Sequence, residues 1–128
     1  MNLTKELILT KVSEKGELLL PNQSALSIPI IERIYKKMLN KLKFPPIHVS
    51  SDNLIVDGHH RYISSLLSDF DIEIVPNYPK PSVVNDFTWK TVEFTVDDWD
   101  SPSKINMLNA LDARYNNMKI EEIESIIE

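Results

Sequence analysis

The sequence has 128 residues, of which 42% are hydrophobic and 26% are charged, and its net charge at pH 7 is −5. These values are ordinary for one globular domain. The absence of cysteine excludes disulfides, thiolate metal sites and cysteine nucleophiles. No apolar run approaches the ~20 residues of a membrane span, and residues 1–6 lack the basic head and apolar run of a signal peptide. We therefore expect a cytoplasmic protein with no membrane partner.

Acidic residues are concentrated near the end of the sequence. Residues 1–96 hold 11 acidic and 11 basic side chains, whereas residues 97–128 hold 8 acidic and 3 basic ones. This balance argues against DNA as a partner, because non-specific DNA binding depends on Lys and Arg that neutralise phosphates. We predict a domain over residues 1–96 and an acidic helical extension over residues 97–128, which packs on that domain and offers helices for a protein partner.

The spacing of apolar residues predicts alternating helices and short strands, and hence an α/β (α+β) fold. Helices are expected over residues 3–15, 28–42, 59–68 and 101–115, with a last helix after Asn117. Strands are expected over residues 18–20, 47–49, 54–56, 72–75 and 91–96, and a loop over residues 76–86. Residues 7–10 fit a strand as well as a helix, so both alternatives stay open there.

Capping and periodicity support these assignments. Ser27 is expected to cap the helix over residues 28–42, with Pro29 in its first turn. The residues expected to face the core in the last strand and the helix after it are Val92, Phe94, Val96, Ile105, Leu108 and Leu111. A solvated outer helix face is expected from Arg33, Lys36, Lys37, Lys41 and Lys43, with contact to nucleic acid or to ligand phosphates as the alternative.

One short motif carries chemistry. The protein has only two glycines, and one of them stands between a predicted strand and a predicted helix, in Asp57-Gly58-His59-His60-Arg61. Glycine permits backbone angles that a tight strand-to-helix reversal requires. Such a turn leaves the first N–H groups of the helix free, and with the helix dipole these groups attract anions. The guanidinium and two imidazoles add donors, so the 57–61 turn predicts a phosphate site.

The surroundings of this turn resemble a known superfamily. Residues 45–49, a short turn, and residues 54–62 with the helix and strand that follow are similar to the ParB/sulfiredoxin superfamily, over about residues 18–78. The resemblance implies a small mixed sheet flanked by helices, followed here by a helical C-terminal extension. It also implies that the 57–61 turn holds the phosphates of a nucleotide, with ATP or ADP and Mg²⁺ as the expected ligands.

Departures from the superfamily narrow the implied activity. His59 stands where sulfiredoxins carry cysteine, which excludes their sulfinic-acid reduction. His60-Arg61 replaces the Arg-Arg form of the chromosome-partition proteins, and the short acidic tail argues against partition on DNA. The motif is nearest to the free-serine-kinase branch, yet Gln23 stands where that branch offers a glutamate. Glutamine cannot serve as a general base, which argues against kinase chemistry by the same route.

Roles follow for each residue if the resemblance holds. Gly58, His59, His60, Arg61 and Gln23 are expected to bind the nucleotide, with Gln23 as a hydrogen-bonding wall. Asp57 and His60 are the candidate catalytic residues for phosphoryl transfer or nucleotide hydrolysis. Asp57 is also the expected contact of Mg²⁺, and His60 joins Arg61 in neutralising developing charge.

Other interpretations of the same residues remain open. The pocket can serve a non-catalytic nucleotide-sensing or protein-interaction module, or a DNA-associated protein or nuclease. More simply, Asp57 can cap the helix while Arg61 pairs with a surface acid. A zinc site would need His48 beside one of the two adjacent histidines. Trp89 and Trp99 are expected in the core or at its rim, with stacking on a base as the alternative.

Overall fold

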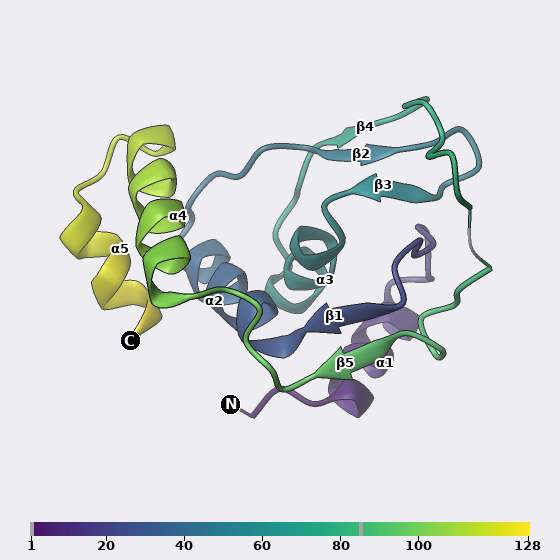
Figure 1. The fold of residues 1–128 in the computed structure, drawn as a ribbon, viewed down its shortest axis with the longest axis horizontal. Helices are drawn as coiled ribbons and strands as arrows, with labels where there is room; N and C mark the ends of the chain where they lie inside the picture. The colour runs from purple at the N-terminus through teal and green to yellow at the C-terminus, as the bar shows by residue number, and fades with distance from the viewer. Residues whose placement is uncertain (1, 85) are drawn as a thin grey trace.

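The computed structural model describes residues 2–84 and 86–128, which form a mixed α/β fold with five helices and two small sheets (Figure 1). The helices are α1 (Lys5–Glu14), α2 (Ile28–Leu39), α3 (His59–Ser68), α4 (Pro102–Tyr115) and α5 (Ile120–Ile127). The strands are β1 (Ala25–Ser27), β2 (Ile47–Val49), β3 (Ile55–Asp57), β4 (Ile74–Val75) and β5 (Glu93–Thr95). No helix of these residues has the length and apolar character that a membrane crossing requires.

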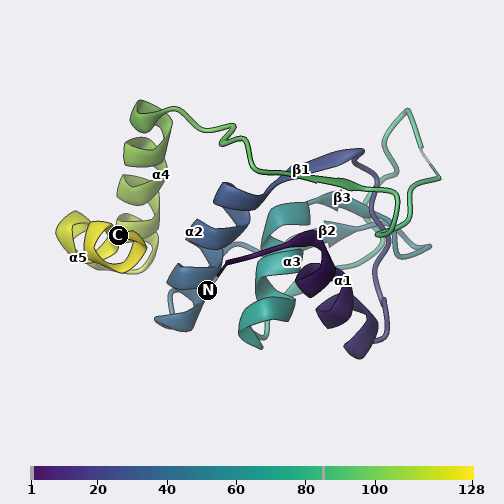
Figure 2. The same ribbon diagram turned by 90° about the horizontal axis from the view of Figure 1, so that it is seen from below.

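The strands form two sheets instead of the single mixed sheet expected. In the three-stranded sheet, β2 lies between β3, to which it is antiparallel, and β4, to which it is parallel. In the second sheet, β1 pairs in parallel with β5, with Leu26 opposite Phe94. Both views show α2 and α3 side by side, with α4 and α5 at the end of the molecule beyond α2 (Figures 1 and 2).

Two apolar clusters hold these layers together. The larger lies among α1, α2, α3 and the sheets, and it includes fully buried Ile31, Ile55 and Ile63. Trp89 belongs to this cluster, and its indole Nε1 donates to the carbonyl of Leu19 over 2.8 Å. Burying an aromatic ring with its polar atom satisfied is favourable. The prediction of Trp89 as a core residue is therefore confirmed.

The smaller cluster joins α4 and α5 to the segment after α2. It consists of Leu42, Ala113 and Ile123, with Phe44 and Met118 among the partly buried residues around them. The helix expected over residues 28–42 ends at Leu39. Lys41 then has a φ of +66°, which turns the chain so that Leu42 enters this cluster.

The prediction of a strand at residues 18–20 is wrong. Leu20 forms only an isolated bridge with Leu54, and Leu18 and Leu20 are exposed, with only Leu19 between them buried. The strand forms further along, at β1, where its pairing partner is β5. The alternative of a strand within residues 7–10 is also wrong, because these residues lie in α1. The hydroxyl of Thr4 caps that helix by accepting from the N–H of Leu7.

The prediction of core-facing side chains in the C-terminal part is wrong for two residues. Val96 is 80% exposed and Leu111 is 50% exposed. The buried face of α4 is instead formed by Asn109 and Ala113, of which Ala113 packs in the smaller cluster with Ile123 of α5. The apolar stripe of α4 therefore does not pack into the core.

The basic face of α2 is also not a solvated outer surface throughout. Lys37 is buried and its Nζ lies 2.6 Å from Oδ2 of Asp112 on α4. Arg33 makes a bidentate ion pair with Asp98, at 2.6 and 2.8 Å. Acidic residues of the C-terminal segment thus neutralise part of the basic face of α2, which corrects the prediction for Arg33 and Lys37.

Candidate functional site

Gly58 makes the reversal from β3 into α3. Its φ of +103° and ψ of 29° lie in the left-handed region that side chains rarely adopt. A Cβ atom there would come within 2.9 Å of Nη2 of Arg61 and 3.0 Å of Cγ2 of Ile47. The position therefore requires glycine for two reasons, backbone angle and close packing.

The start of α3 has no side-chain cap. Gly58 is the N-cap residue and the first helical hydrogen bond runs from the N–H of Tyr62 to the carbonyl of Gly58, over 2.8 Å. The N–H groups of the three residues between them precede that bond and lack helical acceptors. The carboxylate of Asp57 does not cap the helix, so the simpler interpretation of this residue is wrong. No side chain caps the positive end of the α3 dipole.

Both histidines of the 57–61 turn act as hydrogen-bond acceptors. Nε2 of His59 accepts from the N–H of Asn22 over 2.9 Å, and Nε2 of His60 accepts from the N–H of Ser27 over 3.0 Å. Burial is the main cause that lowers the pKa of each from 6.5 to about 4. A neutral imidazole that accepts at Nε2 carries its proton on Nδ1.

These hydrogen bonds fasten α3 to β1 and to the chain before it. The histidines are neutral at pH 7, so neither adds positive charge to the site. The expectation that His60 neutralises developing charge beside Arg61 is corrected accordingly. The role that the contacts give to His60 is to fix the position of α3 against β1.

Arg61 supplies the cation of the turn. Its Nη2 donates to the carbonyl of Pro46 and to Oδ2 of Asp57, each over 3.2 Å. Its Nε is buried and has no hydrogen-bond partner among the described residues. The carboxylate of Asp57 is 61% exposed, and it also lies 3.4 Å from Nδ1 of His48. The partner of Arg61 is thus a surface acid, and such exposed ion pairs contribute little to stability.

The turn opens onto a cavity of about 440 Å³, which we call the turn cavity. Its lining includes all the residues that the sequence predicted for the site, namely Gln23, Asp57, Gly58, His59, His60 and Arg61. Gln23 precedes β1, and the fold brings it to the turn although 33 other residues separate Gln23 from Asp57 in the chain. All six residues therefore line one cavity, and their binding of a ligand stays a prediction.

Four further residues of the lining come from the C-terminal segment: Trp99, Asp100, Lys104 and Leu108. Asp100 is buried and accepts from Nη2 of Arg33 over 3.3 Å and pairs with Nζ of Lys104 at 3.1 Å. The ring of Trp99 lies edge-on to that of His60, with 5.4 Å between centroids. No local sequence pattern marks Asp100 or Lys104 as site residues, because only the packing of α4 brings them to the turn.

The charged groups around the turn cavity are paired with one another. Asp57 pairs with Arg61, and Asp100 pairs with Arg33 and Lys104. The groups of the lining that are left to attract an anion are therefore the N–H groups at the start of α3. Within residues 2–84 and 86–128, no three histidine, aspartate or glutamate side chains gather in a way that would hold a metal ion.

The chain was compared with families, curated proteins and solved structures, and no family model, curated protein or solved structure matches it.

Proposed function

We propose that the start of α3 binds the phosphate of a nucleotide, with ATP or ADP and Mg²⁺ as ligands, in the manner of a ParB/sulfiredoxin-like domain. The observation that carries the proposal is the uncapped start of α3, which meets a cavity of about 440 Å³ beside the buried, unpartnered Nε of Arg61. Free N–H groups at a helix start, together with a guanidinium, suit a phosphate oxyanion. The cavity falls within the size range of small-ligand sites.

Each residue of the site has a distinct part in this proposal. Gly58 makes the turn that directs the N–H groups at the start of α3 toward the phosphate, because its φ of +103° is one that side chains rarely adopt. Arg61, whose side chain is 22% exposed, places its guanidinium beside the phosphate. His59 and His60 hold α3 in place through their bonds to Asn22 and Ser27. The amide of Gln23 lines the cavity and offers both donors and an acceptor to the nucleotide.

Mg²⁺ fits this site only as a companion of the nucleotide. Asp57 offers one exposed carboxylate at the turn, and phosphate oxygens and water would have to complete the octahedral coordination. If the protein transfers or hydrolyses a phosphoryl group, Asp57 is the residue placed to accept a proton. In that reaction Arg61 and the α3 N–H groups stabilise the charge on the phosphate oxygens.

A second candidate is a non-catalytic module that senses the nucleotide. Both carboxylates of the lining are engaged in ion pairs, Asp57 with Arg61 and Asp100 with Arg33 and Lys104. Gln23 cannot accept a proton in the place where the kinase branch carries its glutamate. This shortage of a free base favours binding without turnover.

A thermal-shift experiment tests the proposal. ADP or ATP with Mg²⁺, at about one hundred times its Kd, would stabilise the folded state by about 2.7 kcal/mol and raise Tm by several degrees. Arg61→Gln should remove this shift, whereas Lys90→Gln, an equal loss of charge at an exposed position outside the cavity, should retain it. The proposal is wrong if no nucleotide raises Tm, or if the nucleotide raises the Tm of Arg61→Gln as much as that of the unaltered protein. Phosphate release from ATP separates the enzyme from the sensing module.

A further inference from the structure

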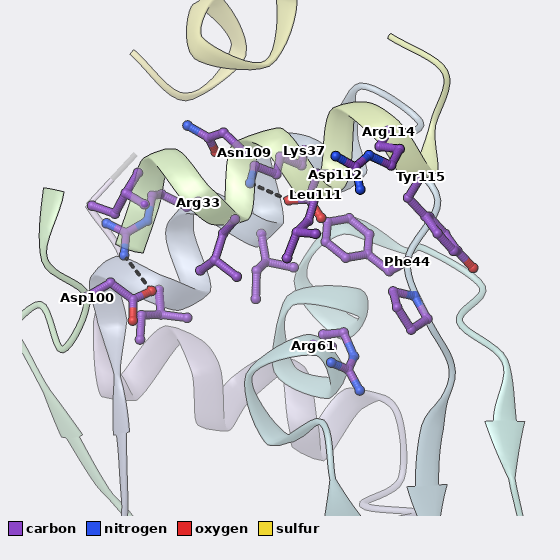
Figure 3. A pocket seen from close by; sticks show the side chains of 15 residues that line it. Arg33, Lys37, Phe44, Arg61, Asp100, Asn109, Leu111, Asp112, Arg114 and Tyr115 are labelled. Carbon is purple, nitrogen blue, oxygen red and sulfur yellow. Dashed lines mark hydrogen bonds and ion pairs between the residues drawn. The ribbon is translucent and has the colours of Figure 1, made fainter. Parts of the chain in front are cut away.

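A second cavity, which we call the groove, adjoins the turn cavity and has a volume of about 500 Å³. It lies between α4 on one side and α2 and α3 on the other. Figure 3 shows Arg61 of α3 across the groove from Leu111 of α4, with Phe44 and Tyr115 together at one end. The residues that line both cavities are Ile30, Ile34, Arg61, Asp100 and Leu108. The two cavities therefore share a wall, and Arg61 lies on the border between them.

The groove offers a mainly apolar surface. Its apolar lining includes Ile30, Ile34, Phe44, Ile105, Leu108 and Leu111. Two charged pairs on the lining are already satisfied internally, since Arg33 pairs with Asp100 and Lys37 pairs with Asp112 at 2.6 Å. A polar sugar would lose hydrogen bonds to water and find few free partners here, whereas a hydrocarbon or aryl group would lose none.

The charge of the lining favours an anionic group on that apolar ligand. The lining contains four cationic side chains, Arg33, Lys37, Arg61 and Arg114, against the carboxylates of Asp100 and Asp112. Arg114 is exposed and forms no ion pair with the residues that the structure describes. The buried Nε of Arg61 is unpartnered in that same part of the chain. The groove thus combines an apolar lining with one cationic side chain, Arg114, that has no ion pair among the described residues, and with the guanidinium of Arg61, whose counter-charge is the exposed carboxylate of Asp57.

We propose that the groove holds the apolar body of a small amphipathic anion, the phosphate monoester of a hydrocarbon or aryl alcohol, whose phosphate lies at the start of α3. This inference rests on the proposed function, because it uses the same phosphate position. It adds the chemical class of a second ligand, which a nucleotide site alone does not imply. Both ligands place a phosphate on the same N–H groups, so the amphipathic phosphate competes with ADP.

The test measures binding of a series of ligands to the full chain by titration calorimetry. The series is inorganic phosphate, butyl, hexyl and octyl phosphate below their micellar concentrations, with octyltrimethylammonium as the cationic control. Each methylene that enters the groove should tighten binding about fourfold. Leu111→Gln should weaken the binding of octyl phosphate about tenfold and leave the affinity for ADP unchanged. Met107→Gln is the matched control, because Met107 is equally exposed on α4, at 53%, and does not line the groove.

The outcomes separate this inference from the function on which it rests. The groove proposal is overturned, and the phosphate site stands, in either of two cases. In the first, ADP binds but the length of the alkyl chain does not change the affinity for the alkyl phosphates. In the second, Leu111→Gln and Met107→Gln change the affinity for octyl phosphate equally. If octyltrimethylammonium binds as tightly as octyl phosphate, the anionic class is overturned. If neither ADP nor any phosphate binds, the phosphate site itself is refuted, and the inference with it. Length-dependent binding that competes with ADP supports both.

Discussion

Lys37 of α2 and Asp112 of α4 form an ion pair with 2.6 Å between Nζ and Oδ2, and only 5% of the lysine side chain is exposed. This pair ties the acidic C-terminal segment to the basic face of α2. It also joins two of the helices that line the groove. The lining of the turn cavity therefore includes residues far along the chain, because Asp100 and Lys104 reach it through the same segment.

Asp112→Asn should lower the free energy of unfolding by about 3 kcal/mol, because it leaves the buried ammonium of Lys37 without its counter-charge. Urea denaturation measures the change. The matched control is Asp52→Asn, which breaks an exposed pair with Lys80 and should lower the free energy of unfolding far less. Equal losses in the two variants would show that the buried pair has no special part in holding α4.

Gly58→Ala should destabilise the protein by about 2–3 kcal/mol and abolish phosphate binding, because the new Cβ meets Arg61 and Ile47 at a positive φ. Gly16→Ala separates the two effects. Gly16 has a φ of +86° with nothing within 4 Å of its added Cβ, so this variant carries the backbone strain alone, about 1 kcal/mol. Denaturation curves for both variants give the difference. A Gly58→Ala protein as stable as Gly16→Ala would contradict the close packing at the turn.

Acidification should destabilise the protein through His59 and His60. Their pKa of about 4 in the folded state lies below the ordinary value of 6.5, so between these values the unfolded chain binds protons that the folded chain excludes. Stability is thus fully present above pH 6.5 and falls as the pH drops toward 4. We expect a loss of about 2–4 kcal/mol between pH 7 and pH 5.

Urea denaturation across this pH range measures the slope, and imidazole NMR titrations assign it. His60→Gln removes one titrating group while an amide oxygen can still accept from the N–H of Ser27, so its pH profile should be flatter. Two histidines that titrate near pH 6.5 in the folded protein would contradict this prediction.

Local signals allowed the turn to be predicted from the sequence. The glycine between a strand and an amphipathic helix is a short-range pattern, and α3 has the predicted bounds, His59–Ser68. The sequence also placed Gln23 in the same pocket, although that placement came from a resemblance to a superfamily. The fold of that superfamily, and its activity, stay predictions.

Long-range pairing explains what the sequence could not predict. β1 is three residues long, and its partner β5 lies far along the chain, so Leu26 opposite Phe94 follows from tertiary packing alone. The three leucines at residues 18–20 have a stronger strand pattern, but only Leu19 is buried. The apolar spacing of α4 predicts a core-facing stripe, because such spacing does not distinguish a packed face from one that lines a groove. The division into residues 1–96 and 97–128 also stays a prediction.

The central claim is that an anion binds on the free N–H groups of α3 beside Arg61, and an NMR titration tests it most directly. In ¹⁵N-labelled protein, ADP with Mg²⁺ should shift the backbone amides of His59, His60 and Arg61 and the Nε–H of Arg61, saturably and with one Kd. Saturable shifts elsewhere that leave these four signals unmoved, or no shifts at all, would contradict it.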